Sequence, residues 1–408
     1  MDDEAATPPN STPSAACTPL YQCSANGWRL VQAYAFEYKK AVGPRWAGCA
    51  LGDVYRDEFS DASTYPFIER AIALGLITVN NQTVPPSHRL RAGDAISHWS
   101  HRHEPPVAFV PASCMIVHDD GDVLVIDKPA TVPIHPCGAY NLNSALQILF
   151  HEHGLSNLHT IHRLDRMTSG LCILARTAAG AKRFHAALSR LDPSLRAEKT
   201  YLALVKGRLP ASAEVLPAAL RIDLERRSDN GDAFAVERRG GDVLEVRYPV
   251  SVVDPKRGVH ECNANGRPST SRFREVAFDA ATATSLVLCA PVTGRTHQLR
   301  LHLQLIGTPI ANDYAYGGDD PWQPPPHAAP TQAPGAGDGG TQLQRLIEAC
   351  PTCNGLATAL KRPEGIYLHA LRFRLMRDGV VEWDFSTPLP RWAADRLVGC
   401  NANNDLVM

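Results

Sequence analysis

The feature that most constrains this chain is a ten-residue segment, residues 162–171, in which one carboxylate stands among cationic side chains. Arg163 and Arg166 flank Asp165, and residues 170–175 form an apolar, partly β-branched run with the length and composition of a buried strand. A carboxylate held among cations at the entry to such a strand stays ionised and can act as a nucleophile. The alternative is that Asp165 only pairs with one of these arginines on a surface loop, which would contribute little to stability.

Residues 162–171 resemble, without a departure, the signature of the RluA-type pseudouridine synthases, His-Arg-Leu-Asp-x-x-Thr-Ser-Gly-Leu. Further segments that are similar to this family follow in the family's order, at residues 122–129, 132–136, 199–207, 293–300 and 310–317, with a late match at residues 366–370. The run at residues 101–107 is similar to a stretch typical of the eukaryotic branch, including members that modify a tRNA anticodon-loop uridine. The resemblance implies an RNA pseudouridine synthase of that branch.

The reaction that the resemblance implies breaks the C1′–N1 glycosidic bond of a uridine, turns the uracil and rejoins it through C5. It changes no oxidation state, so we expect no cofactor. The resemblance gives the catalytic roles to Asp165, Tyr201 and Arg295. Carboxylates suit oxocarbenium-like chemistry, Tyr201 could stack on the base and assist proton transfer, and Arg295 would keep Asp165 ionised and oriented. Arg300 could share or replace the task of Arg295.

Chemistry on a stacked base requires that the nucleotide leave the stack, and the gap must then be filled. Arg163 is our candidate, because a guanidinium plane can stack between bases while it contacts phosphate. His162 is expected to support the loop by hydrogen bonding. The residues that we predict to bind RNA are Arg163, Arg166, His162, Arg300 and Lys199.

The resemblance implies an α+β fold in which the catalytic domain is built on a mixed, largely antiparallel sheet. We expect a disordered tail at residues 1–28, a small S4-like RNA-binding module at residues 29–108, and a pseudouridine synthase catalytic domain at residues 109–400. The tail contains no Lys or Arg and is rich in Ala, Pro, Ser and Thr. Residues 320–345 are dominated by Pro, Gly, Ala, Gln and Asp, which predicts a flexible insertion.

The charge of the chain is unevenly distributed. The formal net charge of the 408 residues is −1, which taken alone does not favour an RNA-binding protein. Residues 160–208 nevertheless carry ten lysines and arginines against three acidic residues, a local net charge of +7. Because phosphate attraction is short-ranged in salt, this local balance matters more than the total. The alternative is that some of these cations only cover solvated helix faces.

Two groups of residues invite a metal interpretation, and each is incomplete. His98, His101 and His103 lie close in sequence with Glu104, but no cysteines are interleaved at ligand spacing. Cys350 and Cys353 form a single Cys-x-x-Cys pair, whereas a closed zinc site needs four ligands. We predict no metal at the functional site, and the cysteine pair stays an open possibility.

We therefore expect a monomeric enzyme that acts on structured RNA, with tRNA favoured over rRNA and mRNA, and without membrane association. The chain has no apolar window long enough to span a bilayer and no secretory or transit signal. Eleven cysteines without regular spacing indicate reduced thiols in a cytoplasmic or nuclear protein, with mitochondria left open. The alternatives are a catalytically idle RNA-binding protein that uses the same cleft, and a bifunctional deaminase, which the absence of a Pro-Cys-x-x-Cys segment disfavours.

Overall fold

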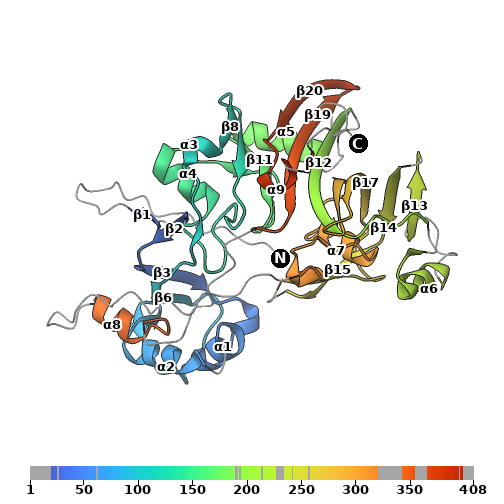
Figure 1. Ribbon diagram of the computed structural model, residues 1–408. Coiled ribbons are helices and arrows are strands. Elements are labelled where there is room, and N and C mark those ends of the chain that lie inside the picture. Colours follow the sequence, from blue (N-terminus) through green and yellow to red (C-terminus); the bar gives the residue numbers. More distant parts are fainter. Residues whose placement is uncertain are drawn as a thin grey trace. The chain divides into compact units, whose positions relative to one another are not determined.

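The computed structural model describes residues 20–24, 27–60, 63–188, 192, 194–212, 215–226, 234–240, 242–255, 258–319, 342–353, 365–394 and 396–397. They divide into two units, the first within residues 1–106 and 329–358 and the second within residues 107–328 and 359–408 (Figure 1). None of the helices in these ranges is long and apolar enough to cross a membrane.

The first unit contains a four-stranded antiparallel sheet with the order β3-β6-β4-β5. Its strands are β3 (Tyr34–Ala41), β4 (Ile77–Val79), β5 (Gln82–Thr83) and β6 (Ala95–Arg102). The helices of this unit that precede β4 are η1 (Pro44–Trp46), α1 (Leu51–Glu58) and α2 (Tyr65–Ala73). Leu51, Ile72 and Ile77 are fully buried and join these helices to the sheet in one core. Burying such aliphatic side chains supplies the main stabilisation of a unit this small.

Two predicted boundaries differ from the structure. Strands β1 (Tyr21–Cys23) and β2 (Trp28–Val31) pair antiparallel, so the last residues of the predicted tail form a hairpin, while residues 1–19 lie outside the described ranges. Helix α8 (Gln342–Glu348) includes the end of the predicted flexible insertion, and residues 320–341 are not described. Leu346 of α8 is 1% exposed and belongs to the core of the first unit, which explains why this stretch is ordered.

The second unit is built on a large mixed sheet with the order β13-β14-β17-β18-β12-β19-β11-β9-β8. Strand β10 pairs with β11. Strand β20 pairs with β19, beside which it lies in Figure 1. The pairing of β11 with β19 is parallel, and the other pairings among the described strands of the sheet are antiparallel. The prediction of a mixed, largely antiparallel sheet is therefore confirmed.

The bounds of these strands are β8 (Ile116–Asp119), β9 (Val123–Lys128), β10 (His159–Thr160), β11 (Ser169–Ala175), β12 (Leu195–Lys206), β13 (Ala235–Arg239), β14 (Val243–Arg247), β17 (Thr270–Asp279), β18 (Thr284–Pro291), β19 (Leu368–Arg377) and β20 (Val380–Ser386). Outside this sheet, β15 (Val250–Asp254) pairs with β16 (Val259–Cys262), and β7 (Val107–Ala108) begins the unit. The helices are α3 (Ala112–Met115), α4 (Ala145–His153), α5 (Ala178–Leu188), α6 (Ala218–Arg226), α7 (Gln298–Leu305), η4 (Tyr314–Tyr316) and α9 (Arg391–Ala394).

Strand β11 is the buried strand predicted after Asp165. From Gly170 to Ala175 every residue of it is buried, because β9 and β19 lie on either side. Gly170 has φ +105°, and a Cβ added there would lie 2.3 Å from the carbonyl oxygen of Ala370. Only glycine fits this approach of two strands. The loop that carries Asp165 is thereby attached to the centre of the sheet.

Candidate active site

The loop between β10 and β11 carries Asp165, and a buried lysine holds the backbone of this loop. The Nζ atom of Lys128 donates hydrogen bonds to the carbonyl oxygens of Pro129 and Val132, both at 2.8 Å, and to that of Arg166 at 3.3 Å. Burial lowers the pKa of Lys128, but three carbonyl acceptors favour the ammonium form, and we assign that form. This ammonium group holds the backbone next to Asp165.

His162 holds the other side of the same loop. Its Nε2 accepts a hydrogen bond from the main-chain N–H of Ile173 at 3.1 Å, and its ring stacks with that of Phe373 at a centroid distance of 6.3 Å. Burial, assisted by the charge of Lys199, lowers the pKa of His162 to about 3, so the ring is neutral. The expected support of the loop is present. The lone pair engaged by Ile173 is therefore not available to RNA.

Asp165 lies beside two groups that come from helix α7 and from the residue before it. The Nη1 atom of Arg300 donates to Oδ2 of Asp165 at 3.4 Å, and Nε2 of His297 lies 3.6 Å from the same oxygen. The Asp165 side chain is 23% exposed, so it is open to a ligand while its cationic partner is buried. This arrangement keeps one carboxylate oriented toward open space.

Arg300 is itself held by a second carboxylate. Its Nε and Nη2 atoms donate to the two oxygens of Asp313 at 2.6 and 2.9 Å, and its guanidinium lies 4.7 Å from the ring centroid of Tyr316. Burial alone would lower the pKa of Arg300, but the hydrogen bonds and charge of Asp313 raise it above the ordinary value. Asp313 is fully buried, so the bidentate pair is rigid as well as charged.

His297 contributes a neutral imidazole to the site. Its Nδ1 lies 2.6 Å from the hydroxyl oxygen of Tyr316, and burial lowers its pKa to about 4. A neutral ring has one N–H, so we assign the Tyr316 hydroxyl as donor to Nδ1 and the Nε2–H as donor toward Asp165. His297 has φ +56°, a left-handed conformation that is strained for a residue with a Cβ and that recurs at functional sites.

Arg295 does not occupy the position that the resemblance implies. Its Nε donates to the carbonyl oxygen of Pro268 at 3.2 Å, its main-chain N–H donates to Gln298 at 3.0 Å, and its side chain is exposed. Both Arg295 and Asp165 line the same cavity, but the guanidinium beside the carboxylate belongs to Arg300. The side chain that contacts Asp165 is thus that of Arg300, the alternative considered from the sequence, and not that of Arg295.

Tyr201 enters the cavity from β12. The register of β12 against β19 shifts between Thr200 and Tyr201, a β-bulge that redirects the tyrosine side chain. The ring packs against the core cluster of the second unit and lines the cavity. Burial, with the charge of Asp165, raises the pKa of the Tyr201 hydroxyl, so the phenol stays protonated at neutral pH.

The cavity around Asp165 is large and basic. Its volume is about 1300 Å³, and its lining includes nine lysine and arginine side chains against three carboxylates. Among the lining residues, Arg163 is exposed and Lys199 is half-buried. Arg166 points elsewhere, since its guanidinium lies 5.4 Å from the ring centroid of Tyr140 and the residue does not line the cavity. The volume exceeds that of a typical small-molecule pocket, and the charge suits a polyanion.

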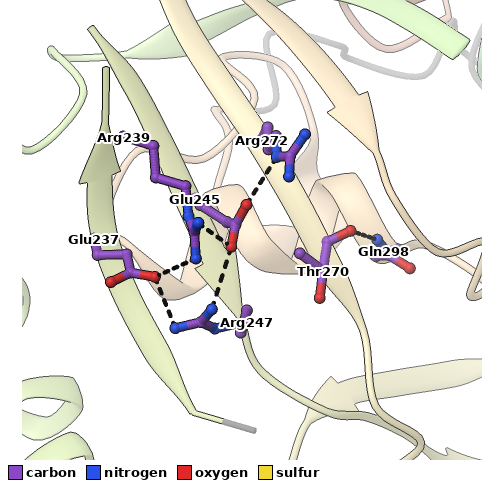
Figure 2. Close-up of polar contacts among 7 residues, drawn as sticks. All are labelled: Glu237, Arg239, Glu245, Arg247, Thr270, Arg272 and Gln298. Carbon is purple, nitrogen blue, oxygen red and sulfur yellow. Dashed lines mark hydrogen bonds and ion pairs between the residues drawn. The ribbon is translucent and has the colours of Figure 1, made fainter. Parts of the chain in front are cut away.

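Glu245 organises part of this basic wall (Figure 2). Its side chain is 4% exposed and contacts Arg239 at 3.0 Å, Arg247 at 3.4 Å and Arg272 at 2.7 Å. Arg239 and Arg272 line the cavity, so one buried carboxylate fixes two of its cations. In the same view, Gln298 donates to the carbonyl oxygen of Thr270 at 2.9 Å and attaches the start of α7 to β17. Sequence reasoning assigned no role to these residues.

The chain is similar in sequence to known RNA pseudouridine synthases. A family model described as RNA pseudouridylate synthase matches residues 122–305. RNA pseudouridine synthase 7 of Oryza sativa subsp. japonica is 31% identical over 394 residues, which cover 90% of this chain and 91% of that protein. RNA pseudouridine synthase 7 of Arabidopsis thaliana is 38% identical over 291 residues, 71% of this chain and 66% of that protein. The mitochondrial tRNA pseudouridine(32) synthase of Saccharomyces cerevisiae is 33% identical over 305 residues, 74% of this chain and 58% of that protein.

The sheet, the basic cavity and these matches define an isomerase that acts on RNA. The chain belongs to the RNA pseudouridine synthase family, in its RluA-type branch with eukaryotic members. The resemblance stated from the sequence is confirmed, and with it the class of enzyme.

Proposed function

We propose that this protein isomerises uridine to pseudouridine in structured RNA, with Asp165 as the nucleophile. The observation that carries the proposal is the placement of Asp165, which faces a basic cavity of about 1300 Å³ while Arg300 at 3.4 Å and His297 at 3.6 Å hold one of its oxygens. The partner cation orients the carboxylate, and an oriented carboxylate is what either attack on C1′ or stabilisation of charge during loss of a C2′ proton requires.

The steps balance without an added reagent. The C1′–N1 bond breaks, the uracil turns within the cavity, C5 bonds to C1′, the proton on C5 leaves and N1 gains a proton. Tyr201 supplies a flat, protonated phenol for the turning base to stack on. Its raised pKa keeps the phenol protonated, which suits stacking and hydrogen-bond donation and argues against a role as a base at neutral pH.

The test is to replace Asp165 by asparagine, which keeps the shape of the side chain and removes its charge. We expect Asp165→Asn to retain folding and RNA affinity and to lose tritium release from RNA that contains 5-tritiated uridine. Asp242→Asn, at an exposed position, is the matched control and should release tritium normally. Turnover by Asp165→Asn within tenfold of the unaltered protein would remove Asp165 from the nucleophile role. If the unaltered protein binds RNA and releases no tritium, it is an idle RNA-binding protein that uses the same cavity.

We propose tRNA as the substrate. The support is the tRNA target in the name of the yeast relative together with a cavity wall rich in arginine. Mapping pseudouridines in cells with and without this protein tests the choice, because loss confined to rRNA or mRNA sites would contradict it. We also propose that the protein is intracellular, because we expect reduced thiols and an RNA substrate. Loss of pseudouridines from cellular RNA in cells without the protein would support this location.

We further propose that the first unit is the S4-like RNA-binding module. We also propose that the whole protein acts as a monomer. Two helices packed on a small sheet support it. Replacing two exposed cations, in a Lys40→Gln/Arg89→Gln variant, should weaken binding and reduce the slope of log K against log salt by roughly one per lost phosphate contact. An unchanged slope would show that these cations do not contact RNA.

A further inference from the structure

Four side chains with metal-binding atoms meet within the first unit, away from the cavity just described. They are His101 on β6, His103 just beyond that strand, and Cys350 and Cys353 just after helix α8. Their ligand atoms all lie within 4.8 Å of one another. Cys350 is buried and the other three are half-buried, unlike the side chains of an exposed acidic patch.

The separations among three of these ligand atoms are close to those of a tetrahedral site, and the sulfur of Cys350 lies within 4.8 Å of each of them. Nδ1 of His101 lies 3.2 Å from Nε2 of His103 and 3.2 Å from Sγ of Cys353, and Nε2 of His103 lies 3.3 Å from the same sulfur. A zinc ion with bonds of about 2.0 Å to nitrogen and about 2.3 Å to sulfur places neighbouring ligands about 3.3 to 3.8 Å apart. Little movement would therefore be needed to enclose an ion.

The local backbone presents the ligands in pairs. Residues two apart on an extended strand point to the same side, which brings His101 and His103 together. The Cys-x-x-Cys turn directs the main-chain N–H of Cys353 to Sγ of Cys350 at 3.5 Å, a contact that would help to stabilise a thiolate at that sulfur. The sulfur of Cys350 also lies 3.7 Å from the carbonyl oxygen of His101, so both pairs are in contact before any ion is considered.

The protonation chemistry of the cluster fits a cation. An imidazole that carries its proton on one ring nitrogen offers a lone pair at the other, and His101 and His103 each direct a ring nitrogen into the cluster. A bound dication deprotonates its cysteine ligands, so Cys350 and Cys353 would bind as thiolates. Two thiolates would neutralise the charge of the ion.

We propose that His101, His103, Cys350 and Cys353 bind a single Zn²⁺ ion in a closed, structural site. Two sulfur and two nitrogen ligands favour zinc over the harder divalent cations, and four protein ligands leave no open position for catalysis. The proposal is independent of the reaction at Asp165.

The site has a clear structural task. Helix α8 is a seven-residue helix and would be marginal by itself in water. Within the described residues, Leu346 packs in the core of the first unit and Glu348 pairs with Arg70. A zinc ion would join the end of this segment to β6 across about 250 residues of chain, and closing so long a loop favours the ordered state.

The experiment measures metal in the full-length protein purified without chelator or added metal. We expect about one zinc per chain by mass spectrometry of the metal content, and about two protons released per ion on reloading the stripped protein. Replacing the zinc by Co²⁺ should give the intense d–d absorption and sulfur-to-cobalt charge transfer of a tetrahedral site. A Cys350→Ser/Cys353→Ser variant should lose the zinc and both bands, while a Cys49→Ser variant, at an exposed thiol of the same unit, should keep them.

Three results would overturn the proposal. One is that the unaltered protein is purified without zinc and shows no tetrahedral spectrum when Co²⁺ is added. This measurement does not depend on whether the double serine variant folds. Another is a double variant that retains its zinc, which would place the ion elsewhere. The third is a Cys350–Cys353 disulfide in the protein as purified, detected as a loss of two hydrogens in the intact mass, which would make the pair a redox element instead.

Discussion

Replacing Arg300 tests the site most directly, because Arg300 and not Arg295 lies beside Asp165. Arg300→Ala removes the donor 3.4 Å from Asp165 and both hydrogen bonds to the fully buried Asp313. The change acts on catalysis through Asp165 and on stability through Asp313. The two effects can be measured separately.

The structure gives a magnitude for each effect. Breaking a buried pair by removing one partner costs about 3 to 5 kcal/mol of unfolding free energy, and Asp313 is 1% exposed at its side chain. A hydrogen bond to a charged group contributes about 1.5 to 3 kcal/mol, which corresponds to a loss of roughly 10- to 150-fold in rate if it acts fully on the transition state. Arg300→Lys keeps the charge and loses the bidentate geometry, so we expect intermediate losses of both kinds.

The assays are urea unfolding followed by circular dichroism and single-turnover tritium release at saturating protein. Arg295→Ala is the matched control, since Arg295 is exposed and its Nε contacts only the carbonyl oxygen of Pro268 among the described residues. We expect it to change the free energy of unfolding by less than about 0.5 kcal/mol and to weaken RNA binding more than the single-turnover rate. The argument is refuted if Arg295→Ala abolishes the single-turnover rate while a folded Arg300 variant keeps it.

Three further predictions follow from single contacts. Arg163→Ala should impair modification of a structured stem-loop more than that of a short unstructured oligonucleotide, because only the former leaves a stacking gap; equal losses would indicate a simple phosphate contact. Gly170→Ala should destabilise the protein by more than about 3 kcal/mol in urea unfolding, whereas Gly138→Ala, with nothing within 4 Å of its added Cβ, should cost about 1 kcal/mol from its positive φ alone. Burial lowers the pKa of His302 to about 4, below the ordinary value near 6.5, so between these two pH values the unfolded state binds a proton that the native state does not. The contribution of the neutral His302 to the free energy of unfolding is therefore complete above pH 6.5 and falls by up to about 1.4 kcal/mol per pH unit toward pH 4. His302→Gln should reduce this dependence of the free energy of unfolding on pH.

Much of the fold was accessible from the sequence because its signals are local. The apolar run after Asp165 is strand β11. Leu299 and Leu303 recur at helical spacing and are buried on α7, and the buried Ile306 follows that helix before Gly307. Spacing of this kind depends only on neighbouring residues.

The partners of Asp165 were not accessible in the same way. Two arginines five residues apart in one matched segment could each face the carboxylate, and the choice depends on where helix α7 begins. Arg295 lies in the turn before that helix and Arg300 in its first turn, next to the buried Leu299. A signal did exist, since an arginine beside a buried stripe requires an acidic partner, and Asp313 lies in the next matched segment.

The two halves of the proposed zinc site could likewise not be joined from the sequence, because they are far apart in the chain. His101 with His103, and Cys350 with Cys353, each looked too small for a closed site because each half contains two ligands. His98 and Glu104, which stand beside the histidines in sequence, turn elsewhere: His98 packs against Tyr55 at 5.4 Å, and Glu104 accepts a hydrogen bond from Tyr34. Proximity in sequence therefore suggested other companions, and the proposed ones lie about 250 residues away, just after the predicted flexible insertion at residues 320–345. A Cys-x-x-Cys pair that follows such an insertion is better interpreted as half of a site whose other half is on an ordered strand, because an ion can order a segment that has too few apolar residues to order itself.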